Sequence, residues 1–380
     1  MAGTVTWETL RELASFRAEK GCALSLYLNL DPSVSPTAGD VDTRMNSLLA
    51  EAEKRLDSAR GELTHDQREG LKGDVRRVAD YFESEFSREG AHGFAVFSAG
   101  LDNFWRPLAV VEPVADHLTV GRDFHLAPLV PLVGRGDGAL VAVVGREQGQ
   151  LLRLRRGRLE EVVDRFDEQL SRHDQGGWSQ ARYQRHIEKH VQEHVKAVVD
   201  QLERWARRLG HPPVVIVASE ENRAEVAPML SKETEAALAG WAQAEAHATR
   251  AELLAVVEPA LERWRSEQET KTIGRWREEA GRNGRAASGW GATLEAASDG
   301  RVELLLFQEG VARQAWQCPA CGRASIEDGS CPLDGTKLEQ REDGLDVAVH
   351  QTLAHGGSVW AVRHHRDLEP VDGIAALLRY

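Results

Sequence analysis

The chain has 380 residues, which is too long for one ordinary hydrophobic core and predicts two or three domains. Its apolar fraction of 42% and charged fraction of 28% are those of a globular protein, and the sequence contains no run of about 18 apolar residues that would predict a membrane-spanning helix. The net charge of -13 argues against a non-specific nucleic-acid binder, although it leaves room for a locally basic surface.

The N-terminal stretch, residues 1–16, is acidic and amphipathic, and it lacks the basic start and apolar block of a signal peptide. We therefore expect a cytoplasmic protein with no membrane partner. Cys22 stands alone in an apolar run, whereas the other three cysteines lie close together, so the cysteines are not those of a secreted disulfide framework.

The first segment combines strands and helices, which predicts an N-terminal α/β domain over residues 1–132. A short helix opens it, and a Pro/Gly-rich loop over 31–40 separates the first strand from a long helical stretch. That stretch covers 43–86 with an interruption near 61–64, and the predicted strands are 23–30, 93–100 and 106–114.

The second segment, residues 133–246, begins with three strands at 139–144, 151–156 and 159–166, which the turns between them join into an antiparallel meander. A long helix over 181–209 follows, then a strand within 211–222 and a helix over 222–230. A meander that leads into a long helix and a further strand is similar to a ribonuclease-H-like layout.

The third segment, residues 247–380, starts with a helix over 250–280 and continues with a short helix and a strand over 301–310. A Cys-rich insert over 316–336 comes next, and residues 346–365 supply another helix and strand. This order predicts a compact C-terminal α/β sandwich that carries the insert.

The long helix of the second segment is amphipathic. Apolar residues recur at steps of three and four and form one stripe: Ile187, Val191, Val195, Val198, Leu202, Trp205 and Leu209. Arg182, Arg185 and Lys189 fall on another face at the same spacing. Such a face is usually solvated, but here it begins beside a Gly-Gly pair, which favours contact with nucleic-acid phosphates.

The Gly-Gly pair, Gly176 and Gly177, permits positive φ angles and close approach of the backbone to a partner. Trp178 can stack on a base, and Gln180 offers an amide donor and a carbonyl acceptor. Because no strong base is present, any chemistry here depends on positioning a water molecule or a backbone amide. The simpler interpretation of the pair is a flexible turn.

The stretch GGWSQARYQRHIEKHV resembles the central-domain signature of the archaeo-eukaryotic release factor and Pelota superfamily. The matching positions are Gly176, Gly177, Ser179, Arg182, Tyr183 and Arg185. The three-domain order is also similar. The likeness is strongest to the bacterial branch, which includes release-factor-like proteins, tRNA-hydrolysing quality-control factors and Balon-type ribosome hibernation factors.

The resemblance implies a factor that binds the ribosomal A site, where Gly176, Gly177, Trp178 and Ser179, with the basic helix face, would contact ribosomal RNA near the peptidyl-transfer centre. It further implies tRNA and a translational GTPase such as elongation factor Tu as partners. The Asn-Ile-Lys-Ser and Tyr-x-Cys-x-x-x-Phe strings that read stop codons are absent from the sequence, so we expect no codon reading. We expect a monomer that hibernates or rescues ribosomes.

Two alternatives stay open. Trp178 stands where the release factors have their catalytic glutamine, which argues against the standard hydrolytic route. Gln180, however, gives a Gly-x-x-Gln spacing similar to that of the tRNA-hydrolase branch, so Gln180 is the candidate catalytic residue of a peptidyl-tRNA hydrolase. The acidity of the chain also fits a protein-interaction scaffold.

The Cys-rich insert places Cys318 and Cys321 on one turn, and Cys331 and Asp334 on a second, each with glycine after its second member. Paired turns of this kind predict a zinc ribbon in which all four residues are ligands of a structural zinc ion. A redox-active Cys pair is less consistent with the paired turns, and the remaining alternative is a degenerate ribbon held together without metal.

Overall fold

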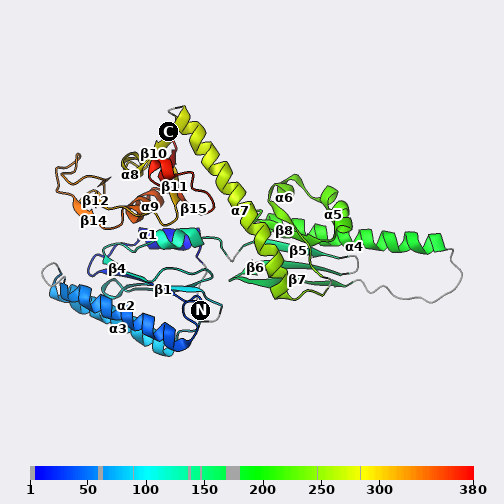
Figure 1. Ribbon diagram of the computed structural model, residues 1–380, viewed down its shortest axis with the longest axis horizontal. Helices are drawn as coiled ribbons and strands as arrows, with labels where there is room; N and C mark the ends of the chain where they lie inside the picture. Colours follow the sequence, from blue (N-terminus) through cyan, green and yellow to red (C-terminus); the bar gives the residue numbers. More distant parts are fainter. Residues whose placement is uncertain are drawn as a thin grey trace. The chain divides into compact units, whose positions relative to one another are not determined.

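The computed structural model describes residues 5–58, 63–88, 90–135, 138–145, 148–167, 180–245, 247–282 and 284–380, without the side chains of 57–58, 163–167 and 180–190. Each of its two compact units contains helices and β-sheet, which confirms the predicted α/β class (Figure 1). Unit 1 comprises Met1–Arg135 and Glu269–Tyr380, and unit 2 comprises Gly136–Gln268. The division into segments 1–132, 133–246 and 247–380 stays a prediction.

The N-terminal part of unit 1 is a four-stranded antiparallel sheet in the order β3-β2-β1-β4. Leu24, Leu26 and Leu28 of β1 face the helices α2 and α3, because alternate side chains of a strand point to opposite faces. The elements are α1 (Trp7–Ser15), β1 (Ala23–Asn29), α2 (Ala38–Ser58), α3 (His65–Ser84), β2 (Gly93–Ala99), η2 (Gly100–Asp102), β3 (Phe104–Val110), β4 (His117–Gly121) and η3 (Ala127–Leu132).

The predicted loop over 31–40 was too long, since α2 begins at Ala38. Thr37 and Asp40 explain the earlier start. The N–H of Asp40 donates to Oγ1 of Thr37 at 3.2 Å, and the N–H of Thr37 donates to Oδ2 of Asp40 at 2.9 Å. This reciprocal pair satisfies backbone donors at a helix start in the manner of a capping box.

The C-terminal part of unit 1 is a sheet in the order β10-β16-β11-β15, in which β11 and β15 pair in parallel. This sheet and the other face of the N-terminal sheet share one hydrophobic core. That core contains Tyr27, Phe97, Leu305 and Leu353. The elements are β10 (Ala286–Ser288), α8 (Trp290–Ser298), β11 (Val302–Gln308), α9 (Gly344–Ala354), β15 (Ser358–Val362), η5 (Glu369–Val371) and β16 (Ile374–Leu378). A separate small sheet in the order β13-β12-β14 holds the predicted insert, with β12 (Ala315–Gln317), β13 (Ala324–Ser325) and β14 (Glu339–Arg341).

Unit 2 is a five-stranded sheet in the order β7-β6-β5-β8-β9. The predicted antiparallel meander is confirmed, and β8 joins it in parallel to β5. The elements are β5 (Leu140–Val144), β6 (Gln148–Arg155), β7 (Arg158–Asp167), α4 (Gln180–Arg208), β8 (Val214–Ala218), α5 (Glu220–Val226), η4 (Ala227–Met229), α6 (Lys232–Ala236) and β9 (Leu238–Ala242).

Helices cover both faces of the unit 2 sheet. From Val191 onwards the predicted apolar stripe of α4 packs against one face, with Val195, Val198 and Leu202 almost inaccessible to solvent. The helix α7 (Arg250–Gly281) buries Val257 and Leu261 against the other face and continues into unit 1. None of the helices in the described parts of the chain has the length and apolar character needed to cross a lipid bilayer.

Candidate functional site

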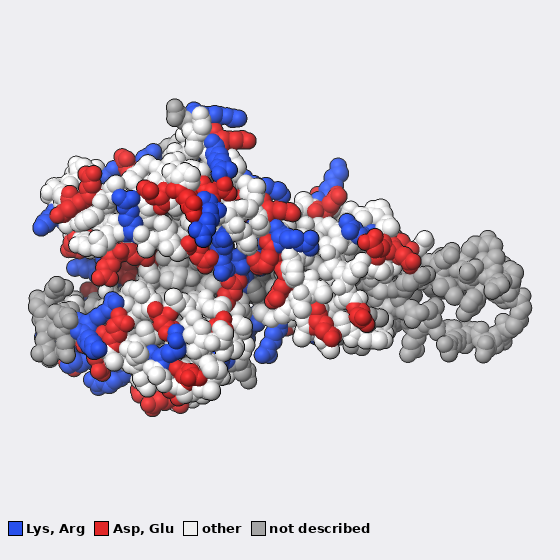
Figure 2. Space-filling model, viewed as in Figure 1, with Lys and Arg blue, Asp and Glu red and all other residues white. Residues whose placement is uncertain are grey.

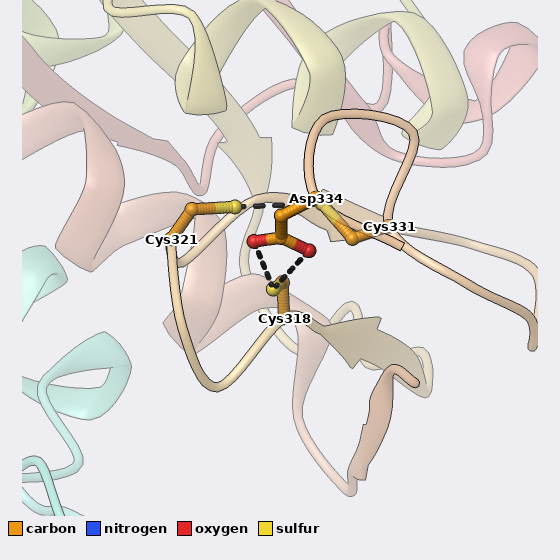
Figure 3. A group of neighbouring side chains, drawn as sticks. All are labelled: Cys318, Cys321, Cys331 and Asp334. Atoms are coloured by element: carbon orange, nitrogen blue, oxygen red, sulfur yellow. Dashed lines mark hydrogen bonds between the residues drawn. The ribbon is translucent and has the colours of Figure 1, made fainter. Parts of the chain in front are cut away.

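Cys318, Cys321, Cys331 and Asp334 converge in the small sheet of unit 1 (Figure 3), and their potential ligand atoms all lie within 4.8 Å of one another. The sulfurs of Cys321 and Cys331 are 3.5 Å apart, and the sulfur of Cys318 lies 3.5 Å and 3.7 Å from the two carboxylate oxygens of Asp334. Tetrahedral zinc, with Zn–S of about 2.3 Å and Zn–O of about 2.0 Å, has edges of roughly 3.8 Å between sulfurs and roughly 3.5 Å between sulfur and oxygen. The cluster can therefore hold a metal ion with the geometry that zinc prefers.

The first of the two turns, or knuckles, is closed by two backbone hydrogen bonds. The N–H of Cys318 donates to the carbonyl of Arg323 at 2.8 Å, and the N–H of Gly322 donates to the carbonyl of Cys318 at 2.9 Å. Gly322 follows the ligand Cys321 and has a φ of +80°, a conformation that side chains other than glycine rarely adopt. This is the physical reason for glycine after the second ligand.

The second knuckle repeats the same pattern. The N–H of Cys331 donates to the carbonyl of Thr336 at 2.8 Å, and the N–H of Gly335 donates to the carbonyl of Cys331 at 2.9 Å. Gly335 has a φ of +75°. Asp334 thus occupies the position that corresponds to Cys321 in the first knuckle. The repeated geometry supports Asp334, rather than a residue elsewhere, as the fourth ligand.

The electrostatics of the cluster favour anionic ligands at two positions. A hydrogen bond from the backbone N–H of Cys321 is the main cause that lowers the pKa of Cys318. Hydrogen bonds from the backbone and side chain of Thr336 lower the pKa of Asp334 to about 2. At Cys321 the N–H of Arg323 favours the thiolate, but desolvation and the neighbouring sulfurs outweigh it and raise the pKa to about 11. A metal ion would displace the remaining thiol protons, since the thiolate is the ligand form.

The knuckles are anchored to the rest of unit 1. The side-chain amide of Gln351 in α9 donates to the carbonyl of Gly322 at 3.0 Å, and that of Gln317 in β12 donates to the same carbonyl at 3.1 Å. Cys318 and Cys331 are buried, whereas Cys321 and Asp334 are exposed. A metal ion held by all four residues would have only protein ligands, as structural zinc sites do.

The Gly-Gly segment is the second candidate. Gly176, Gly177, Trp178 and Ser179 lie outside the described residues, and Gln180 is the first residue of α4. The basic residues Arg182, Arg185 and Lys189 occupy the first three turns of α4, at spacings that place them along one side of the helix. Their side chains are outside the described part of the chain, so the roles assigned to them stay predictions.

A family comparison bears on this segment. Residues 125–262 match the model of bacterial archaeo-eukaryotic release factor family 10. This region of the chain is therefore similar to the bacterial archaeo-eukaryotic release factors. The family region contains the meander, the Gly-Gly segment, α4 and the first part of α7. The resemblance inferred from the sequence is thus confirmed.

The chain also has low similarity to solved structures of a termination factor and of Pelota proteins. The chain is 17% identical to an archaeal translation termination factor, aRF1, with 99% of each chain covered and a TM-score of 0.26. It is 13% identical to Archaeoglobus fulgidus Pelota, with 99% of this chain and 93% of that one covered and a TM-score of 0.38. It is 14% identical to archaeal Pelota in a ribosome-bound model with ABCE1, with 100% of this chain and 95% of that one covered and a TM-score of 0.43. No curated protein matches the sequence.

A buried polar cluster that the sequence did not predict joins the N-terminal and C-terminal parts of unit 1. The carboxylate of Asp346 in α9 lies 3.4 Å from Nδ1 of His125 and 3.6 Å from Nε2 of His350, and Nε2 of His125 lies 3.8 Å from Asp343. The one available signal was Asp346 and His350 at a spacing of four in an otherwise apolar helix. His125 is more than 200 residues away in the sequence, so no local pattern could have connected it.

Proposed function

We propose that this protein is a translation factor that binds the ribosomal A site and hibernates or rescues stalled or dormant ribosomes without reading a stop codon. The observation that carries the proposal is the family match over residues 125–262, because this region contains the Gly-Gly segment and the helix that follows it. The lack of codon-reading strings in the first segment supports a role other than codon-specific termination.

In this proposal the Gly-Gly segment is a docking element. Gly176 and Gly177 let the backbone approach ribosomal RNA near the peptidyl-transfer centre, and Trp178 stacks on an exposed base. Arg182, Arg185 and Lys189 on α4 neutralise phosphates beside it. The amphipathic form of α4 supports this assignment, since its apolar stripe is fixed in the core of unit 2 and leaves other faces of the helix for a partner.

The proposal also assigns roles to the three predicted domains. The central domain, residues 133–246, is ribonuclease-H-like and presents the Gly-Gly segment. The N-terminal domain, 1–132, approaches the decoding site, and the C-terminal domain, 247–380, faces a translational GTPase such as elongation factor Tu. A structural zinc ion bound by Cys318, Cys321, Cys331 and Asp334 stabilises the C-terminal domain, and the factor acts as a cytoplasmic monomer with ribosome and tRNA as partners.

Sedimentation of the full chain with ribosomes tests the proposal. Ribosomes from growing and stationary-phase cells are pelleted through sucrose with the chain, and we expect co-sedimentation with at least one of the two. Reversal of Arg182, Arg185 and Lys189 to glutamate should reduce the bound fraction at least tenfold. A control variant with three basic residues reversed at exposed positions outside this segment, Arg11, Arg263 and Arg366, should bind like the wild type. Absence from ribosomes of both sources would refute the proposal.

A second candidate function is peptidyl-tRNA hydrolysis, favoured by the position of Gln180 as the first residue of α4 after the Gly-Gly segment. Its side-chain amide would orient the attacking water, because nothing in the segment can act as a strong base. Release of labelled peptide from stalled complexes, lost on Gln180→Ala, would establish it. If the glutamate reversals change neither ribosome binding nor function in cells, the protein-interaction scaffold replaces both candidates.

A further inference from the structure

The hairpin between β6 and β7 has an unusual turn. β6 ends at Arg155 and β7 begins at Arg158, so Arg156 and Gly157 alone connect the strands. Their φ angles are +50° and +68°, as in the type I′ turns that suit the twist of a two-residue hairpin. The first of these positions favours Asn, Asp or Gly, because a side chain like that of arginine meets steric repulsion in the left-handed region. Arginine at position 156 therefore works against the stability of the turn.

The charges at this turn also oppose one another. Arg155 and Arg158 are direct cross-strand partners, and like charges at such positions destabilise a hairpin. Attraction to nearby acidic side chains offsets this repulsion only weakly. Glu160 lies 3.7 Å from the guanidinium of Arg155, but both side chains are about half exposed, and such pairs contribute little. Arg156 and Arg158 have no ion-pair partner among the residues that the structure describes.

The surface of the turn offers charge without apolar area. Arg155, Arg156 and Arg158 are exposed, whereas the flanking Leu154 and Leu159 are buried. A protein partner normally requires an apolar contact core surrounded by polar residues. A nucleic-acid backbone requires only cations that can approach its phosphates, and the planar guanidinium group donates two parallel hydrogen bonds to a phosphate. These features favour a polyanionic backbone as the partner.

We propose that Arg155, Arg156 and Arg158 form a second RNA-contact site that binds backbone phosphates. The choice of RNA as the partner rests on the proposed function. The arginines lower the stability of the turn, which is expected of residues that serve a partner rather than the fold. The site is separate from the Gly-Gly segment. It lies at the start of β7, whose 10 residues end at Asp167, whereas the Gly-Gly pair begins at Gly176. The chain would thus hold RNA at two points of unit 2.

The test compares two triple variants of the full chain that remove the same charge. One is Arg155→Gln/Arg156→Gln/Arg158→Gln, and the control is Arg11→Gln/Arg263→Gln/Arg366→Gln at exposed positions elsewhere. Dissociation constants are measured for purified ribosomes, for an RNA duplex of about 20 base pairs and for polyglutamate over a series of salt concentrations. The hairpin variant should bind ribosomes and duplex about tenfold or more weakly, and the slope of log K against log salt should fall by about 2 to 3. The control should match the wild type.

A thermal melt separates a binding role from a structural one. The hairpin variant should melt at the same temperature as the wild type or higher, because the repulsion between Arg155 and Arg158 is removed. An unchanged salt slope for RNA, or a loss confined to polyglutamate, would overturn the inference, as would a wild type that binds neither RNA probe. A wild type that binds the duplex through these arginines but does not bind ribosomes would support the inference and contradict the proposed function.

Discussion

The carboxylate of Asp346 ties α9 to the N-terminal part of unit 1, so we expect Asp346→Asn to destabilise that unit. Its Oδ1 accepts hydrogen bonds from the N–H groups of Leu126 at 2.6 Å and Ala127 at 3.1 Å. The same carboxylate lies 3.4 Å from Nδ1 of His125, and both side chains are mostly buried. Asparagine keeps an oxygen that can accept a hydrogen bond, but it loses the negative charge beside the histidine.

The expected loss of stability is about 3 kcal/mol. Removal of one partner from a buried ion pair costs about 3 to 5 kcal/mol, because the other charge stays buried without compensation. The lower end applies here, since Asp343 remains 3.8 Å from Nε2 of His125 and still favours its charged form. For a unit of about 250 residues, a loss of about 3 kcal/mol lowers the melting temperature by about 6 to 12 °C.

The pH dependence of this loss follows from the two pKa shifts. Burial would lower the pKa of His125, but Asp346 and Asp343 outweigh it and raise the pKa above the ordinary 6.5, so the stabilisation is present below pH 6.5 and is lost as the pH rises through the folded-state value. Burial opposes ionisation of Asp346, but His125 and His350 hold its pKa below the ordinary 3.8, so its contribution is lost only in more acidic solution. The difference between wild type and Asp346→Asn should therefore be largest between about pH 4 and pH 6.5.

Thermal melts of the full chain at several pH values measure this difference. Asp367→Asn is the matched control, because Asp367 pairs with Arg277 at an exposed site, where such pairs contribute about 1 kcal/mol or less. A double variant with His125→Gln should lose less stability than the sum of the single variants, since both disrupt the same pair. If Asp346→Asn lowers the melting temperature no more than Asp367→Asn does, or by the same amount at pH 5 and pH 9, the argument is wrong.

We expect the purified chain to carry one zinc ion, with Cys318→Ser losing it and Asp334→Cys retaining it, because thiolate at the fourth position completes the same tetrahedron. Elemental mass spectrometry checks this, and a wild type without zinc would contradict the ribbon. Gly149→Ala in unit 2 should cost about 1 to 3 kcal/mol, since its Cβ would lie 2.3 Å from Cγ2 of Val198. Gly274→Ala, in the part of α7 that belongs to unit 1, has open space around its Cβ and should add about 1 kcal/mol. Denaturant unfolding compares the two, and a loss of stability at both positions or at neither would speak against this packing.

Elements with a complete local pattern could be predicted from the sequence. The helix predicted over 181–209 is α4 at Gln180–Arg208, because its apolar stripe recurs at helical spacing for about six turns and packs against a sheet. The strands β4, β9, β10 and β16 were not predicted. β16 is a run of five apolar and small residues without alternation, and it becomes a strand because it pairs with β10 and β11, which are far away in the sequence. Such long-range pairing leaves no local signal.

The candidate metal site was predictable for a related reason. Its four ligands come from two short turns, so the spacing of Cys318 and Cys321, repeated by Cys331 and Asp334, already contains the geometry. The cluster around Asp346 was not predictable, since His125 lies in the N-terminal part of unit 1, far from Asp346 in the sequence. What a sequence pattern supplies is therefore the local part of a site, and tertiary pairing supplies the rest.

The acidity of the chain does not oppose RNA binding at the proposed contacts. A net charge of -13 acts over the whole surface, but at physiological salt the field of a charge falls off within about 8 Å, so a phosphate senses mainly the side chains nearest to it. At the β6–β7 turn those are Arg155, Arg156 and Arg158, while Glu160 lies 3.7 Å from Arg155 and Glu161 pairs with Arg250 at 3.0 Å. Acidic and basic side chains are interspersed on the face shown in Figure 2, and the acidic ones would disfavour RNA binding away from the proposed contacts.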